Sequence, residues 1–171
     1  LFSTTDVSQS QRLGKLEGLE RAESKAVGLR AVIGGRQAIA SSTDLSASAL
    51  AELAARAVAM AKAAPEDPDS TLAPLALHPA SLPDLELEDR KEPPLSWLSE
   101  QIGAAEDAAL SVKGVSNSEG AEAQYGKTHV CLGIMAGKGI AFAQGSSSSH
   151  FSVSVSVVAG EGTSMERDYD F

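Results

Sequence analysis

Between residues 27 and 64 the spacing of apolar residues changes from every second residue, as in a strand, to the three-and-four spacing of a helix. This change constrains the fold of the chain more than any other sequence feature. Apolar residues alternate with other residues from Val27 to Ile33, which predicts a strand with one apolar face. Gly34-Gly35 follows, and glycine adopts the positive φ angles of a two-residue hairpin turn without a steric penalty. Residues 36–42 are then expected to form the return strand of a β-hairpin.

A helix is predicted directly after this hairpin. Ser46 is a favourable N-cap because its hydroxyl accepts a hydrogen bond from the first turn, and Pro65 is expected to end the helix. The apolar residues between these limits recur at helical spacing, and they are Leu50, Leu53, Ala54, Ala57, Val58 and Ala61. A hairpin with one apolar face and a helix with one apolar stripe predict a two-layer unit in which the helix covers the sheet.

The segments around this unit are less regular. Residues 1–22 predict one curved or edge strand that contains two glycines, and residues 20–25 predict a charged turn before the hairpin. All seven prolines lie between Pro65 and Pro94, which predicts an extended connector that lies along the surface.

A second helix is predicted to begin near Ser96. Its narrow apolar stripe consists of Leu98, Ile102, Ala105 and Ala109. Glu100, Glu106 and Asp107 are expected outside this stripe. Trp97, the only tryptophan, is interpreted as a packing anchor in the first turn, with stacking on a ligand as the alternative.

From Val112 onward the apolar period is two residues. Strands are expected at 122–136, 140–144, 151–157 and 165–171, and the serines at 146–149 are expected to form a loop. The short glycine turns between these strands predict an antiparallel meander. The predicted fold class is α+β: a mostly antiparallel sheet, made of the hairpin and the C-terminal meander, covered by two helices.

We expect residues 1–111 to form a hairpin-helix-strap-helix unit, and residues 112–171 to form the meander that starts a middle region. The chain begins without Met and stops inside a strand pattern, so we expect it to be a fragment of a longer protein.

The charge balance restricts the partners. The net charge of −9 and the lack of a long basic run argue against direct binding to nucleic acid or to an anionic membrane. No apolar run reaches the roughly 20 residues of a membrane-spanning helix. A single cysteine allows no internal disulfide, which fits a reducing compartment such as the cytoplasm, and Cys131 is expected to be a buried and inert thiol rather than a reactive one.

The sequence contains no recognisable catalytic motif. His129 and His150 lie in predicted strands, and two ligands are one short of a catalytic zinc site. Ordinary strand histidines are therefore the favoured interpretation, and an enzyme with a metal held by these two residues is the alternative. We predict no catalytic and no metal-binding residue in this chain.

One polar tetrapeptide remains as a candidate site. Asn117-Ser118-Glu119-Gly120 consists of turn-forming residues, so its first interpretation is a structured turn that opens the meander. Its alternative interpretation is a contact with a partner or a peptide. The residues assigned to that contact are Arg30, Asn117, Ser118, Glu119 and Gly120.

Several short segments, in this order and spacing, resemble the N-terminal region of the TldD/PmbA family, the modulators of DNA gyrase. They are Arg12-Leu-Gly-Lys-Leu-Glu17, Gly28-Leu-Arg30, Gly34-Gly-Arg-Gln37, Ser42-Thr-Asp-Leu-Ser46, Ala64-Pro-Glu-Asp-Pro68, Asn117-Ser-Glu-Gly120 and Met165-Glu-Arg-Asp-Tyr169. Two of these segments, Gly34-Gly-Arg-Gln37 and Ala64-Pro-Glu-Asp-Pro68, look more like the PmbA (TldE) branch of the family than the TldD branch.

The resemblance implies a subunit of a cytosolic TldD–TldE metallopeptidase that cleaves unfolded peptides, in microcin maturation and antitoxin degradation. It places zinc on the TldD-type partner, in an HExxxH-type motif that this chain lacks, so no catalytic residue is carried over. The expected role is a non-catalytic scaffold, inactive alone, that pairs with a TldD-type subunit or with itself. A sheet with exposed strands would hold an extended peptide by main-chain pairing. The alternative is a modulator of DNA gyrase that acts by protein–protein binding.

Overall fold

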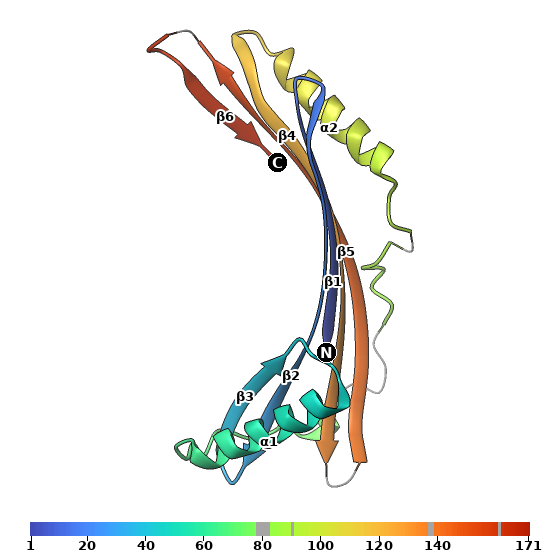
Figure 1. Cartoon of the computed structure of the whole chain (residues 1–171), viewed down its shortest axis with the longest axis vertical. Coiled ribbons are helices and arrows are strands. Elements are labelled where there is room, and N and C mark those ends of the chain that lie inside the picture. Colours follow the sequence, from blue (N-terminus) through green and yellow to red (C-terminus); the bar gives the residue numbers. More distant parts are fainter. Residues whose placement is uncertain (78–82, 90, 137–138, 161) are drawn as a thin grey trace. The chain divides into compact units, whose positions relative to one another are not determined.

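The computed structural model describes residues 1–77, 83–89, 91–136, 139–160 and 162–171. These residues form a six-stranded antiparallel sheet, with the strand order β3-β2-β1-β4-β5-β6, and two α-helices (Figure 1). The elements are β1 (Phe2–Arg12), β2 (Lys15–Ile33), β3 (Arg36–Ser42), α1 (Ala47–Ala63), the 3-10 turn η1 (Leu75–Leu77), α2 (Leu95–Leu110), β4 (Val115–Ala136), β5 (Gly139–Ala159) and β6 (Glu166–Asp170). The predicted α+β class is confirmed.

The chain forms two compact units, and β1, β2, β4 and β5 contribute residues to both. Unit 1 contains Leu1–Ser3, Ser24–Leu85 and His129–Ser146, and unit 2 contains Thr4–Glu23, Glu86–Thr128 and Ser147–Phe171. The predicted domains, residues 1–111 and 112–171, are two consecutive stretches of the chain, whereas each compact unit combines three separate stretches. The predicted boundary between residues 111 and 112 stays a prediction. Within the described ranges, neither helix combines the length and the apolar character needed to cross a membrane.

In unit 1, the predicted hairpin and helix are confirmed. Strands β2 and β3 pair from Val27↔Ser42 to Ile33↔Arg36, and both glycines of the turn have positive φ, 54° at Gly34 and 71° at Gly35. Helix α1 covers this hairpin, and it begins after Ser46, whose Oγ accepts a hydrogen bond from the Ala49 amide at 3.3 Å.

The apolar stripe of α1 is narrower than predicted. Only three of its six apolar residues are buried, namely Leu53, Ala57 and Ala61. Leu53 and Ala57 form a core with Ala40, against which Val27, Leu29 and Ala31 pack. Leu50 and Val58 remain exposed because this small core reaches only the centre of the helix face.

In unit 2, helix α2 packs on the sheet through Leu98 and Ile102. The other buried residues of this core come from β1 and β4, and they are Val7, Ala121, Ala123 and Tyr125. Trp97 packs against this core and contacts Phe151, with ring centroids 4.6 Å apart and ring planes at 59°. This contact agrees with the interpretation of Trp97 as a packing anchor.

The prediction of one strand over residues 1–22 is wrong, because the chain reverses at Leu13-Gly14 and forms the β1–β2 hairpin. Both residues have positive φ, 50° at Leu13 and 73° at Gly14. Gly14 is a turn residue, but a leucine rarely adopts positive φ, so the pair Leu13-Gly14 gives a weaker turn signal than Gly34-Gly35. The charged turn predicted at 20–25 is also wrong: these residues lie inside β2, where Arg21 forms an exposed ion pair with Glu92 at 2.6 Å.

The meander contains fewer interruptions than predicted. Residues 146–149 lie inside β5 rather than in a loop, since the Ser149 amide donates to the Leu87 carbonyl at 2.8 Å and its Oγ accepts from the Asp89 amide at 2.8 Å. The connector therefore forms two hydrogen bonds with Ser149, at the end of the segment predicted to be a loop. The glycine turn predicted at 137–139 includes residues 137 and 138, which lie outside the described residues, as do 78–82 of the connector.

Candidate functional site

The four candidate residues 117–120 lie inside β4, not in a turn. Alternation along the strand separates their side chains: Ser118 is fully buried, whereas Asn117 is exposed and Glu119 is partly exposed. Arg30 lies in the unit 1 part of β2, where its Nε donates to Gln37 Oε1 at 2.8 Å. The structure therefore brings residues 117–120 together in unit 2 and does not group Arg30 with them.

Ser118 binds a buried carboxylate, that of Glu106, which was predicted to lie outside the apolar stripe of its helix. Glu106 of α2 is only 2% exposed, and the Ser118 hydroxyl donates to its Oε1 at 2.5 Å. The prediction that Glu106 lies outside the apolar stripe is wrong. Its position eight residues after Leu98 and four after Ile102 was the signal, since this spacing follows the buried stripe.

The carboxylate of Glu106 also holds the unpredicted turn between β1 and β2. The Leu13 amide donates to Oε1 at 2.8 Å, the Gly14 amide donates to Oε2 at 3.0 Å, and Gln11 Nε2 donates to Oε2 at 3.2 Å. Glu106 thus satisfies the backbone N–H groups that the reversal leaves without strand partners.

Burial and hydrogen bonding shift the pKa of the Glu106 carboxyl in opposite directions. Burial alone would raise the pKa of the Glu106 carboxyl, but the donors, with the Ser118 hydroxyl foremost, lower it by more, so the pKa lies below its ordinary value. The group is therefore a charged structural anchor rather than a proton donor near neutral pH.

Glu119 points to the other face of β4 and joins β4 to β6. Arg167 Nη2 donates to Glu119 Oε1 at 2.7 Å, its Nε lies 2.5 Å from Oε2, and the Ser156 hydroxyl donates to Oε2 at 3.0 Å. The Arg167 guanidinium, followed by the Ser156 hydroxyl, lowers the pKa of Glu119. This two-point geometry fixes the carboxylate toward Arg167.

The two histidines of the metal hypothesis belong to different units, His129 to unit 1 and His150 to unit 2. His150 lies over Gly126, where an added Cβ would be 2.1 Å from His150 Cε1 and 2.7 Å from Asp6 Oδ1. Over the described ranges, no group of three or more His, Cys, Asp or Glu side chains is arranged to hold a metal ion.

Unit 1 exposes six large apolar side chains, which we call the apolar ribbon: Leu1, Phe2, Val130, Leu132, Met135 and Ile140. Alternation along β4 places Val130 and Leu132 on one face of the strand and Met135 on the other, so the ribbon occupies both faces of this segment. Each is at least 43% exposed, and residues 128–149 contain no Asp or Glu. Cys131 is also exposed, so the prediction of a buried thiol is wrong; this end of β4 exposes residues on both of its faces.

Comparisons with known proteins agree with this fold. Residues 3–61 match the family domain described as PmbA/TldA metallopeptidase domain 1. The chain is 33% identical over 169 residues to metalloprotease PmbA from Escherichia coli O157:H7, and 31% identical over 173 residues to a metalloprotease PmbA homolog from Haemophilus influenzae. These alignments cover 98% and 96% of this chain, but the chain spans only 37% and 36% of the two relatives.

Solved structures show the same fold. A protein from Bacteroides thetaiotaomicron, assigned as a modulator of DNA gyrase, superposes with a TM-score of 0.76 at 21% identity, over 98% of this chain and 38% of its own. TldE from Thermococcus kodakarensis superposes with a TM-score of 0.63 at 16% identity, over 99% of this chain and 38% of its own.

Proposed function

Because this chain carries the first domain of the PmbA/TldD family in residues 3–61 and resembles the N-terminal portion of PmbA along nearly its whole length, we propose that it is the non-catalytic N-terminal part of a PmbA/TldE-like peptidase subunit. Its role is to shape the assembly. Zinc and the bond-breaking residues reside on a TldD-type partner, and the substrates are unfolded peptides, such as microcin precursors or antitoxins. The site of action is the cytoplasm.

The observation that carries this proposal is the apolar ribbon. The ribbon concentrates exposed large apolar side chains in one segment of unit 1, and a concentration of this kind favours an interaction site over singly scattered residues. Two-stranded segments are marginally stable in water unless another surface packs on them. Residues 128–149 also lack carboxylates in a chain of net charge −9, so a partner surface that carries negative charge would meet little repulsion at this segment.

The sheet supports the peptide-holding part of the proposal. Strands β3 and β6 are at the two edges of the strand order, so each has a row of backbone groups that a peptide can pair with. Asn117 and Arg30 are exposed candidates for peptide or partner contact. Glu119 and Gly120 are partly exposed candidates, and the Glu119 carboxylate is already bound by Arg167 and Ser156. Ser118 contributes indirectly, because its hydroxyl is committed to Glu106.

The test combines the chain with a zinc-loaded TldD-type subunit and measures complex formation and cleavage of an unfolded peptide. The Leu132→Asp variant is expected to weaken the complex by at least about tenfold, since it places a charge in an apolar contact. Leu16→Asp is the matched control, because Leu16 is 60% exposed in the unit 2 part of β2, compared with 55% for Leu132.

Peptide cleavage is expected only when both subunits are present, and a chelator is expected to abolish it. Robust cleavage by this chain alone, or equal effects of the two variants on the complex, would overturn the proposal. Recovery of gyrase with this chain, with no binding to the TldD-type subunit, would instead favour the alternative function of a gyrase modulator.

A further inference from the structure

The last part of the connector crosses the sheet of unit 2 just before α2 begins. Four of its residues bind the sheet, and we call them the latch: Leu87, Glu88, Asp89 and Glu92. Strands β2, β4 and β5 each supply one partner, namely Arg21, Lys127 and Ser149. The latch and these partners all belong to unit 2, so the latch connects strands that are not all neighbours in the sheet.

Two ion pairs join acidic residues of the latch to basic residues of the sheet. Lys127 Nζ binds the Glu88 carboxylate, and the two side chains are partly buried, at 24% and 31% exposed. Arg21 Nη1 donates to Glu92 Oε1 at 2.6 Å, but these side chains are more exposed, at 48% and 43%. The hydrogen bond with Glu88 raises the pKa of Lys127 above its ordinary value, so Lys127 stays charged near neutral pH. The Glu88–Lys127 pair is thus the less solvated of the two charged contacts.

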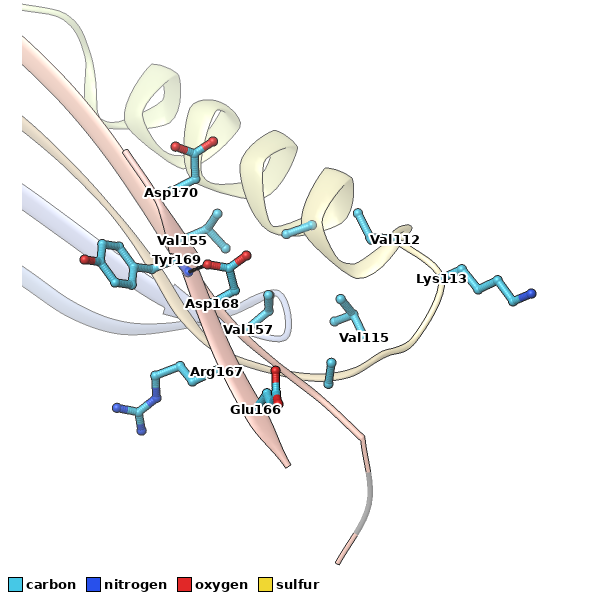
Figure 2. A pocket seen from close by; sticks show the side chains of 12 residues that line it. Val112, Lys113, Val115, Val155, Val157, Glu166, Arg167, Asp168, Tyr169 and Asp170 are labelled. Atoms are coloured by element: carbon cyan, nitrogen blue, oxygen red, sulfur yellow. Dashed lines mark hydrogen bonds between the residues drawn. The ribbon is translucent and has the colours of Figure 1, made fainter. Parts of the chain in front are cut away.

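The latch also covers part of the outer edge of β5. The Ser149 amide donates to the Leu87 carbonyl at 2.8 Å, and the Asp89 amide donates to Ser149 Oγ at 2.8 Å. Strand β6 pairs with this edge farther along, from Val155 to Ala159, and Figure 2 shows β6 there beside a pocket of about 580 Å³. Within the described part of the chain, the latch therefore provides the acceptor for the Ser149 amide.

Hydrophobic burial contributes little to the latch. Leu87 is its one apolar residue and is 51% exposed, and the described core of unit 2 contains no residue of the latch. Salt screens ion pairs between partly exposed side chains, whereas it does not weaken the burial of apolar surface in this way. The latch is therefore held by contacts that weaken when their charges are screened or reversed.

The first part of the same connector is held differently, within unit 1. Ser70 is only 2% exposed, and its hydroxyl donates to Asp67 Oδ2 at 2.7 Å. The Asp67 amide donates to the Gly35 carbonyl at 2.7 Å, which ties the connector to the β2–β3 turn through its backbone. The ion pair between Arg36 and Glu66 is long, at 3.9 Å, and contributes little. Salt is therefore expected to act on the latch and not on this first part.

We propose that the latch is a reversible ionic device, closed over β5 while Glu88 and Glu92 pair with Lys127 and Arg21, and opened when these charges are screened or reversed. An uncovered strand edge has backbone groups that pair with other chains, and natural proteins cover such edges. The latch thus controls whether the β5 edge around Ser149 is covered. The inference concerns contacts inside unit 2, and it stands independently of the proposed function.

The test measures hydrogen exchange of single amides in the whole chain by NMR. The Ser149 amide reports opening of the latch, and the Leu13 amide, which donates to Glu106 in the same unit, reports the stability of unit 2. Lys127→Glu places a second carboxylate beside Glu88, so we expect the exchange rate of Ser149 to rise at least about tenfold and that of Leu13 to change less than about twofold. Raising the salt from about 0.05 M to about 0.5 M is expected to accelerate Ser149 in the native chain at least about threefold.

The matched control is Lys113→Glu, because Lys113 is exposed and follows the C-terminal end of α2, whereas the latch precedes the N-terminal end of this helix. It changes the net charge by the same amount and is expected to alter the exchange of Ser149 by less than about twofold. The exchanged pair Glu88→Lys/Lys127→Glu is expected to restore the native rate to within about threefold. Equal acceleration in Lys113→Glu, no restoration by the exchanged pair, no effect of salt, or equal acceleration of Leu13 and Ser149 would each overturn the proposal.

Discussion

The Ser118 hydroxyl and the Glu106 carboxylate form a 2.5 Å hydrogen bond between two buried side chains, one on β4 and the other on α2. The same carboxylate accepts from the Leu13 and Gly14 amides, so one ionised group connects α2, β4 and the β1–β2 turn. Hydrogen bonds to a charged acceptor are stronger than neutral ones, and they are costly to leave unmade. This group therefore controls the stability of unit 2.

Replacing Glu106 with Gln is expected to lower the free energy of unfolding by about 2–3 kcal/mol, since the amide keeps the shape but turns an NH₂ group toward the donors. Urea denaturation measures this change. Glu100→Gln is the control, because Glu100 is exposed on the same helix, and it is expected to change stability by less than about 0.5 kcal/mol. Equal losses for the two variants would show that Glu106 is not an anchor.

Ser118→Ala is expected to cost about 1.5–3 kcal/mol, because it removes the shortest bond to the carboxylate and also the hydroxyl that accepts from the Gly120 amide at 3.0 Å. The double variant Ser118→Ala/Glu106→Gln is expected to lose less than the sum of the single changes. Strict additivity in this double-mutant cycle would contradict a direct Ser118–Glu106 interaction.

The stability of the chain is expected to depend on pH through Glu106. Its ordinary pKa is 4.5, and its pKa in the folded chain is lower, so the unfolded state binds this proton more tightly. The stabilisation is fully present above the unfolded pKa, and it is lost as the pH falls through the folded pKa. The difference in unfolding free energy between the native chain and Glu106→Gln should therefore shrink from about pH 7 to about pH 3. If the difference in unfolding free energy stays constant over this pH range, the charge of Glu106 does not contribute to stability.

The two hairpin turns show what the sequence could predict. Gly34-Gly35 was predictable because glycine is the local signal for positive φ. The turn at Leu13-Gly14 carries this signal at Gly14 only, because the φ of 50° at Leu13 accompanies a hydrogen bond to Glu106, which lies 93 positions away. Local patterns contain no information about such a long-range contact.

The candidate site was predictable only in part. The composition of residues 117–120 marked the segment as unusual, but their turn propensity was outweighed by strand pairing and by the buried bond of Ser118. The exposure of Cys131 was not predictable either, since its apolar neighbours have the same pattern as a buried strand. Which surface stays uncovered depends on the tertiary arrangement.

Gly160 is expected to tolerate alanine poorly. Its φ is +92°, and an added Cβ would lie 2.2 Å from the Ser164 carbonyl oxygen, which is backbone and cannot swing away. Gly162 is the matched control, with φ of +62° and no atom within 4 Å. Gly162→Ala should cost about 1 kcal/mol from backbone strain, and Gly160→Ala clearly more. Hydrogen exchange of Val158, which pairs with Arg167 in β6, reports the local loss, and equal protection in both variants would refute this prediction.

Trp97 provides a specific probe of the packing between α2 and β5, because it is the only tryptophan. Phe151→Ala removes the ring 4.6 Å from the Trp97 centroid, so solvent gains access to the indole. We expect a red shift of the tryptophan emission and a loss of about 1–2 kcal/mol, because Phe151 is itself 39% exposed. Phe2→Ala is the control: Phe2 is similarly exposed, at 43%, but belongs to unit 1, so the emission should not change. An unchanged emission in Phe151→Ala would mean that the indole has another protecting neighbour.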